Sequence, residues 1–313
     1  MRKSIALILG ALSLAFVPAV GAANIQNLTD GLTTFVDKAT GSLPFASAAG
    51  LDWSDSYIGS IVGVPPHFGL GIVAGGTTIP GKTVKPLIDA LGGPSLSGDL
   101  FIPLAAVNGR IGGFMLPFDV GLKVSIVPTL TLDKYEITYQ NYGFDVRYAV
   151  FEGGLVLPTV SVGAGVDYFS TKVKGTYGSA LDYTATPGTL HVGAPTATLD
   201  LSSVVFEAKA QGSWPLLIVT PYLGLSALVG SSTAKAGVSS QITSSTGNVN
   251  DWLSYLPGVT PTGFSKDKSV TNFGLKVYGG TSINIVVVKL DLQGMYSLLE
   301  GSYGGSLGVR FQL

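Results

Sequence analysis

Hydrophobic and polar residues alternate with a period of two over many short stretches of this chain. In the final stretch, residues 301–313, the apolar side chains of Leu307, Val309 and Phe311 share one side, and small or polar residues occupy the other. Such alternation predicts a β-strand. A closing strand with one continuous apolar face needs a partner for its edge and an apolar medium for its face. A closed barrel in a lipid bilayer supplies both.

The same alternation recurs along the chain. The predicted strands lie near residues 67–79, 98–108, 118–128, 136–151, 157–173, 196–211, 216–232, 269–281, 285–298 and 302–313. The connections alternate between long or polar ones (80–97, 129–135, 174–195 and 233–268) and short ones (109–117, 152–156, 212–215 and 282–284), with 299–301 as the exception. Outer-membrane barrels combine an even strand number with short periplasmic turns and long outer loops. We therefore predict an all-β fold, a transmembrane antiparallel up-and-down β-barrel of about ten strands.

One stretch departs from the alternation. Within residues 196–211, Leu201 lies on one side of the predicted strand, whereas Val204 and Phe206 lie on the other. A β-bulge inserts one extra residue and so moves the following side chains to the opposite face. We therefore expect a bulge near residues 202–203.

The first residues form a targeting segment. Two basic residues precede an apolar run at residues 5–17, and small residues follow it. This is the pattern of a secretory signal peptide, which predicts cleavage after Ala22 or Ala23. Residues 1–23 are therefore expected to be absent from the exported protein.

Residues 24–65 lack strand periodicity. Apolar residues at helical spacing predict a short helix that Gly41 can end, and the irregular stretch after it runs up to two consecutive prolines, Pro65 and Pro66. We predict that residues 24–65 form a helical or irregular plug before a barrel of residues 66–313. The alternative is a tail that rests on the mouth of the barrel. The residues expected to pack in the plug are Leu28, Leu32, Phe35, Val36, Trp53 and Tyr57.

The composition agrees with a membrane barrel. Charged residues make up 12% of the 313 residues and the mean hydropathy is +0.45, whereas about 25% of residues are charged in a soluble domain. Beyond the N-terminus no apolar run is long enough for a helical membrane span. The net charge of −1 gives no reason to expect nucleic acid as a partner. Cysteine is absent, which excludes disulfides and thiolate chemistry.

Charged residues recur on the side of the strands opposite the aliphatic ones, close to the predicted periplasmic turns or the C-terminus. We call them the lumen belt: Asp119, Lys123, Asp145, Arg147, Asp167, Glu207, Lys209, Lys276, Lys289, Asp291 and Arg310. Charges of both signs inside a narrow barrel are expected to pair, since an unpaired buried charge is costly. Two interpretations follow. The belt is either a gate or constriction, or a salt-bridged core that holds the barrel rigid.

The tight connection at 299–301 predicts how the last two strands pair. It places Arg310 opposite position 290, with Asp291 and Lys289 in diagonal reach. Arg310 should therefore bind Asp291. Lys289 then needs a carboxylate from elsewhere, and the candidates are Glu207 and Asp145.

Catalytic residues are scarce. Of the two histidines, His67 lies at the barrel entry and His191 in a long outer loop, where Asp182 is its only acidic neighbour of the kind that omptin-like proteases use. No His or Cys cluster has the spacing of a metal site. The Gly-rich residues 69–75 do not match a nucleotide-binding fingerprint. We therefore predict no enzymatic activity, no metal and no cofactor.

Several short motifs resemble those of a known group. Residues 52–55 (Asp-Trp-Ser-Asp), 57–59, 65–69 and 112–119 resemble motifs of spirochaete (treponemal) outer-membrane β-barrel proteins. That group is loosely similar to the FadL-like family of long-chain fatty-acid channels. The resemblance implies an N-terminal hatch that plugs the barrel and the passage of hydrophobic molecules by diffusion.

Two functions remain open. The first is a passive channel or binding protein for small hydrophobic molecules, which we favour because a separate plug is superfluous in a scaffold for loops. The second is a structural barrel or adhesin that presents its outer loops. Both predict a monomer in the bacterial outer membrane, with the lipid bilayer as partner. An apolar cavity beside the plug would favour the channel. The outer-loop residues expected to form a contact patch or lid are Trp252, Leu253 and Tyr255.

Overall fold

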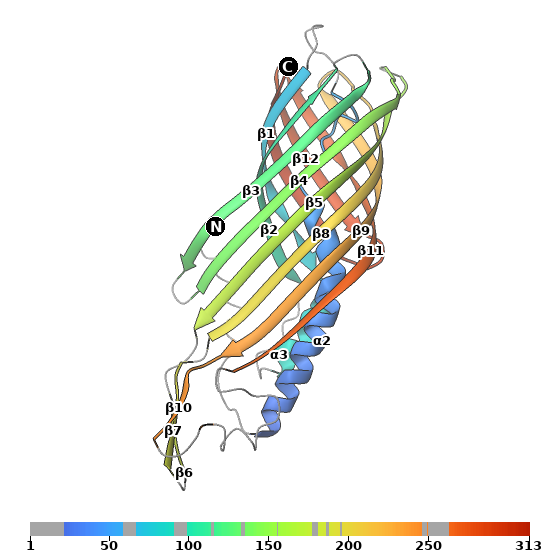
Figure 1. The fold of residues 1–313 in the computed structure, drawn as a ribbon. Helices are drawn as coiled ribbons and strands as arrows, with labels where there is room; N and C mark the ends of the chain where they lie inside the picture. The colour runs from blue at the N-terminus through green and yellow to red at the C-terminus, as the bar shows by residue number, and fades with distance from the viewer. Residues whose placement is uncertain are drawn as a thin grey trace.

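A closed barrel of ten antiparallel strands makes up most of the molecule (Figure 1). The computed structural model describes residues 22–58, 67–90, 99–113, 116–132, 135–154, 156–176, 181–185, 188–194, 196–245, 249 and 263–313. The barrel strands are β1 (His67–Ile79), β2 (Leu100–Gly112), β3 (Phe118–Leu132), β4 (Tyr135–Phe151), β5 (Thr159–Thr176), β8 (Thr196–Ser213), β9 (Val219–Ser239), β11 (Gly263–Ile285), β12 (Val288–Ser297) and β13 (Tyr303–Gln312). The predicted fold class and strand number are confirmed.

Successive barrel strands are neighbours in the barrel, and β1 closes it by pairing with β13. We call the end that carries the short connections 113–117, 152–158, 214–218 and 286–287 the turn end, and the opposite end the loop end. A small sheet of β6 (Leu181–Ala185), β7 (Gly188–Val192) and β10 (Ile242–Ser244) projects beyond the loop end (Figure 1). The described helices include none long and apolar enough to span a membrane.

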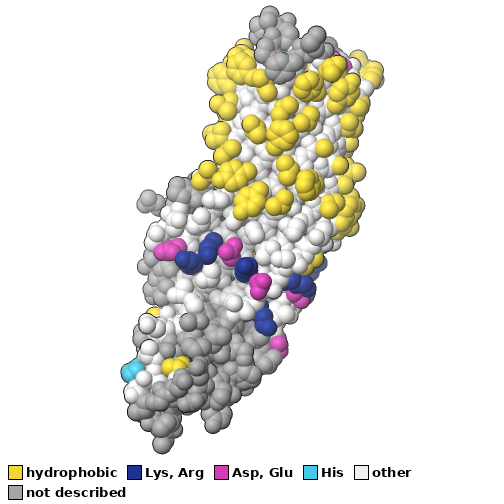
Figure 2. Space-filling view, in the orientation of Figure 1, with side chains coloured by type: hydrophobic (Ala, Val, Ile, Leu, Met, Phe, Trp, Pro, Cys, Tyr) yellow, Lys and Arg dark blue, Asp and Glu magenta, His cyan; other side chains and the backbone are white. Residues whose placement is uncertain are grey.

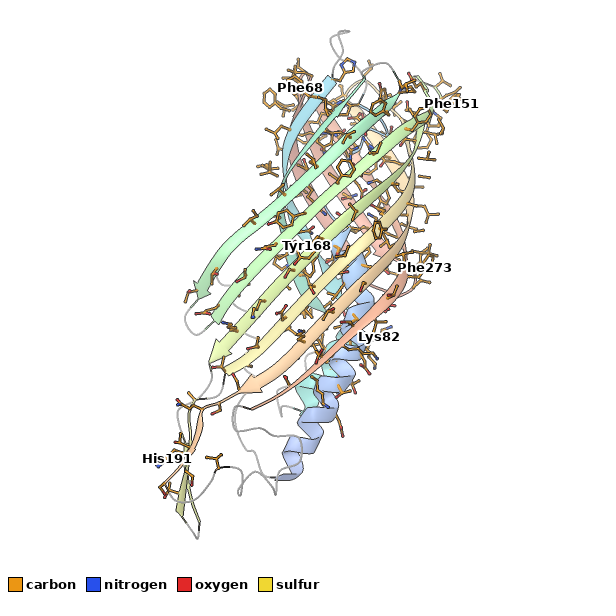
Figure 3. All side chains as sticks on the ribbon, viewed as in Figure 1. Phe68, Lys82, Phe151, Tyr168, His191 and Phe273 are labelled. Carbon is orange, nitrogen blue, oxygen red and sulfur yellow. The ribbon has the colours of Figure 1, made fainter. Side chains whose placement is uncertain are left out.

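Apolar side chains cover the outside of the barrel over its turn-end half (Figure 2). Leu122, Phe206 and Leu307, for example, are each more than half exposed. Phe68 and Phe151 lie at the turn end, while Tyr168 and Phe273 lie nearer the middle of the molecule (Figure 3). An outer surface of this kind is the one that a barrel presents to lipid.

A row of alternating charges lies beyond this apolar belt, toward the loop end (Figure 2). Four charged residues lie directly opposite one another on neighbouring strands, in the order Lys172 on β5, Asp200 on β8, Lys235 on β9 and Asp267 on β11. We call these four residues the charge ladder. The ladder faces outward. Because charged side chains on the outside of a barrel are destabilising in contact with lipid, the ladder lies outside the lipid-covered part of the strands.

The apolar face of β8 changes sides without a bulge. Val204 and Phe206 point outward, but Leu201 and Val205 are buried inside the barrel. The pairing of β8 with β5 and with β9 is continuous across these residues, so the expected bulge near 202–203 is wrong. The environment changes instead. Near the turn end lipid covers the outside, whereas near the loop end an internal helix takes up the apolar inner face.

This helix is α2 (Ala22–Ser47), which enters the barrel from the loop end (Figure 1). Phe35 and Val36 are buried in one apolar cluster with Phe169 of β5 and Leu201 of β8. The side chains of Leu28 and Leu32 lie outside the described ones. The expectation that Gly41 ends the helix is wrong, because packing against the wall outweighs the cost of about 1 kcal/mol that a glycine imposes on a helix.

Two further differences concern the loop end. The predicted loop 80–97 contains a second helix, α3 (Gly81–Ala90), which packs with α2. The strands β3, β4, β5, β8, β9 and β11 are longer than β1, β2, β12 and β13. Because β12 pairs with β11 only from Lys276 onward and Leu298 donates to the carbonyl of Leu275, no strand among the described residues pairs with residues 263–274 of β11 on that side. We call the resulting gap in the wall the notch.

Candidate functional site

The segment that follows α2 runs along the lumen toward the turn end, and polar side chains of the wall bind its backbone. Lys123 donates hydrogen bonds to the carbonyls of Ser47 and Ala49, at 2.8 and 2.7 Å. Asn108 donates to the carbonyl of Gly50 at 3.0 Å. A segment without regular structure has unpaired carbonyls, and the wall satisfies them here. We call residues 48–58 the lumen plug.

Asp52 of the lumen plug binds two lysines of the wall. Its carboxylate oxygens lie 2.9 Å from Nζ of Lys209 on β8 and 2.8 Å from Nζ of Lys276 on β11. All three side chains are buried. This carboxylate therefore holds the plug to two neighbouring regions of the wall.

Asp55 binds the next two strands of the wall, β12 and β13, which follow β11 around the barrel. Its Oδ2 lies 2.7 Å from Nζ of Lys289 on β12 and 2.9 Å from Nη2 of Arg310 on β13. Lys289 and Arg310 face each other directly in the strand pairing. Their like charges would repel without the carboxylate between them.

The remaining ion pairs join wall residues to one another. Arg110 binds Asp119 at 2.5 Å and Asp145 at 2.7 Å, and Arg147 binds Asp119 at 2.8 Å. Further pairs are Lys123 with Asp167 at 2.8 Å, Lys276 with Glu207 at 2.8 Å, Lys209 with Asp145 at 2.7 Å and Arg310 with Asp291 at 3.0 Å. These buried ion pairs lie at the depth of the apolar belt and fall into three groups. The first joins Arg110, Asp119, Arg147, Asp145, Lys209, Asp52, Lys276 and Glu207, the second joins Lys289, Asp55, Arg310 and Asp291, and the third is Lys123 with Asp167.

The charges of these groups balance only when the plug is counted. The structure places all eleven residues of the lumen belt on the inner face and adds Arg110, so the described wall contributes seven cations and five carboxylates. Asp52 and Asp55 supply the two missing negative charges. We call the complete set the lumen network.

Sequence reasoning missed Arg110 because it treated residues 109–117 as a turn. In the structure β2 continues to Gly112, and Pro103 lies within it with its ring outward. The signal was present, since Val107 and Ile111 alternate with Asn108 and Arg110. The pairing of Arg310 with Asp291 is confirmed, but the predicted register is wrong by one residue, because Arg310 lies opposite Lys289 and not opposite position 290. Neither Glu207 nor Asp145 binds Lys289, because the plug supplies its partner.

Both plug carboxyls lie outside the membrane-spanning strands, and both are ionised. Burial alone would raise the pKa of Asp52, but Lys209 and Lys276 outweigh it and hold that pKa well below its usual range. Burial likewise opposes ionisation of Asp55, but Arg310 and Lys289 keep its pKa lowered. The two plug carboxylates are therefore negatively charged at neutral pH.

Trp53 fixes the plug between these two carboxylates. Its ring lies 4.5 Å from the guanidinium carbon of Arg310 and 5.7 Å from that of Arg110, which are cation–π distances. A Cβ on Gly69 would lie 2.7 Å from the ring, so β1 needs a glycine there. Tyr57, nearer the turn end, is half-buried.

Other residues singled out from the sequence are not part of this network. Trp252, Leu253 and Tyr255 lie outside the described residues. His191 is exposed on β7, directly opposite Asp182 of β6 in the backbone pairing. His67 is buried at the start of β1. In the described part of the chain, no group of His, Cys, Asp and Glu could hold a metal ion.

Among the described residues, two cavities adjoin the N-terminal segment. One lies beside Trp53 and Asp52 and has a volume of about 20 Å³, room for about one water molecule. The other, of about 470 Å³, is an open groove at the loop end between α2, α3 and β11, with a polar lining. Neither is an apolar cavity of the size that a small hydrophobic ligand needs, about 300–1,000 Å³.

A closed antiparallel barrel with an apolar outer belt and a charged, plugged lumen is a β-barrel of the outer-membrane type. The chain belongs to the Lsa36-like family, whose model matches residues 101–313. The match begins in β2, so α2 and the lumen plug lie outside it. The resemblance to spirochaete barrels and FadL-like channels stays a prediction. No curated protein matches the sequence.

Among solved structures, the chain is similar to several outer-membrane proteins. The attachment invasion locus protein Ail of Yersinia pestis is 12% identical, with 80% of this chain and 100% of that chain covered and a TM-score of 0.27. The outer membrane protease OmpT from Escherichia coli is 9% identical, with 83% and 100% covered and a TM-score of 0.40. The Pseudomonas putida toluene transporter TodX is 9% identical, with 85% and 96% covered and a TM-score of 0.27.

Proposed function

We propose that this protein is a closed barrel of the bacterial outer membrane that presents its loop end to the exterior. The observation that carries this proposal is the lumen network, in which the two plug carboxylates balance the excess of two cations in the described wall and give Lys289 its partner. Breaking such a buried network to open a pore would be costly. The sequence favours a channel or binding protein for small hydrophobic molecules over a barrel that presents its loops. We now favour presentation, because the cavity beside the plug is too small for a ligand.

The long strands fit the same role. β9 and β11 have 21 and 23 residues, whereas about 9–11 residues suffice to cross a bilayer. Their extra length continues past the charge ladder and supports the small sheet beyond the loop end. By the loop-length rule for outer-membrane barrels, this end faces the cell exterior.

A second candidate function is the passage of small hydrophobic molecules. One observation favours it, namely the notch between β11 and β12, where α2 and not a strand covers the inner side. A molecule could leave the barrel sideways there. The polar lining of the groove at the notch argues against an apolar ligand.

Two measurements on the full chain separate these functions. Proteases added to intact cells should cleave the β6–β7 hairpin, where His191 is exposed, and leave the barrel uncut. Proteoliposomes should take up a fluorescent fatty acid no faster than empty liposomes. A hairpin protected in intact cells would contradict presentation. Faster uptake by the proteoliposomes would support the second candidate.

A further inference from the structure

The groove at the notch combines a polar lining with an apolar border. It lies between Lys38 of α2, Lys82 of α3, Asn272 of β11 and Glu300 in the β12–β13 turn, and its volume is about 470 Å³. Phe273 directly follows Asn272 in the chain, and Leu299 directly precedes Glu300. The side chains of Phe273 and Leu299 are each more than half exposed. Figure 3 shows Lys82 just beyond Phe273 at the edge of the barrel.

The groove therefore lies at the boundary of the lipid-covered surface. Phe273 ends the apolar belt on β11, and the exposed charge ladder residue Asp267 lies further toward the loop end on the same strand. A membrane-bound amphiphile would place its head at this height and its chains against the apolar belt. This placement does not depend on which end of the barrel faces the exterior.

Two cations of the groove are not used by the fold. Lys268 forms an ion pair with Asp37, and its Nζ lies 2.9 Å from Oδ1 of Asp37. Asn272 donates to the carbonyl of Thr40 at 2.9 Å and so ties β11 to α2. Within the described residues, Lys38 and Lys82 form no ion pair, and both are exposed.

We propose that this groove binds the phosphate-bearing head of an anionic membrane amphiphile. Lys38 and Lys82 would contact the phosphate from two different helices. Thr83, which also lines the groove, offers a hydroxyl donor beside them. The acyl chains would lie outward on Leu298, Leu299 and the neighbouring lipid-facing surface. A lysine near an anionic membrane surface contributes about 1 kcal/mol, which corresponds to roughly fivefold in affinity.

Native mass spectrometry of the full chain, released from neutral detergent micelles doped with phosphatidylglycerol or phosphatidylcholine, tests this. The wild type should retain more phosphatidylglycerol than phosphatidylcholine. The double variant Lys38→Gln/Lys82→Gln should lose about 25-fold in affinity for it. The matched control Lys172→Gln/Lys174→Gln removes two lysines that are similarly exposed on the outside of β5 and should bind like the wild type.

Three results would overturn the proposal. Equal losses in both double variants would mean diffuse attraction to the whole surface. Equal retention in all three proteins would mean that the groove lysines do not bind the lipid. Displacement of the lipid by inorganic phosphate, at an ionic strength matched with chloride, would mean a site for free phosphate and not for an amphiphile. Unaltered heat-modifiable migration on gels would verify that each variant is folded.

Discussion

Lys289 and Arg310 face each other directly across β12 and β13, and both bind the same carboxylate oxygen of Asp55. Two cations at such a position repel each other unless an anion lies between them. The anion comes from a segment more than two hundred residues earlier in the chain. The wall of the barrel is therefore incomplete without its plug.

Replacing Asp55 with Asn should lower the free energy of unfolding by about 3–5 kcal/mol, the cost of leaving a buried charge without its partner. The matched comparison is Asp291→Asn. Among the described residues Asp291 forms an ion pair only with Arg310, and Arg310 keeps Asp55 as a second partner. Asp291→Asn should therefore cost clearly less. Urea unfolding of both variants in one detergent measures the difference, and equal costs would contradict the bridging role of Asp55.

The plug carboxyls should also make stability depend on acid pH. Their pKa values lie below the ordinary 3.8 in the folded protein, so between the folded and ordinary values the unfolded chain binds more protons. Their contribution is complete above about pH 5 and is lost as the pH falls below about 4. The stability gap between the wild type and the double variant Asp52→Asn/Asp55→Asn should be constant from pH 7 to pH 5 and narrow below. If the stability gap narrows around pH 6 instead, the plug carboxyls do not have lowered pKa values, which would contradict this prediction.

Neighbouring residues on β5 should respond differently to truncation. Phe169 is fully buried and packs edge-on against Tyr139, at 5.6 Å between ring centroids, beneath α2. Phe169→Ala should leave a cavity under the helix, at a cost of about 3–5 kcal/mol, and make α2 sensitive to protease. Tyr168 points outward, so Tyr168→Ala should leave α2 as resistant as in the wild type. Equal sensitivity of the two variants would contradict the packing of α2 in the barrel.

The alternation of residues was sufficient to predict ten strands and the inner face that carries the charges. It could not reveal the partners of Asp52 and Asp55, because the lumen plug has no period that orients its side chains. The side change at Leu201 and Val204 was visible, but a bulge explains it as well as a change of surroundings does. Only the position of α2 decides between them. Pro103 obscured β2, and with it Arg110.

The direction of the N-terminal segment allows a test of topology. Because the chain lacks cysteine, single cysteines can be introduced cleanly at Asp30 on α2 and at Val156 in a turn-end connection, both of which are exposed. A membrane-impermeant maleimide should label Asp30→Cys in intact cells. Val156→Cys should react only after permeabilisation. The opposite pattern would mean that the barrel is inserted the other way round.

Ion conductance of the full chain in planar lipid bilayers tests the closed lumen most directly. The wild type should show no persistent conductance. The double variant Asp52→Ala/Asp55→Ala should show a conductance that prefers anions, because the wall then keeps two uncompensated cations. A steady open conductance in the wild type, unchanged in the double variant, would contradict the claim that the plug closes this barrel.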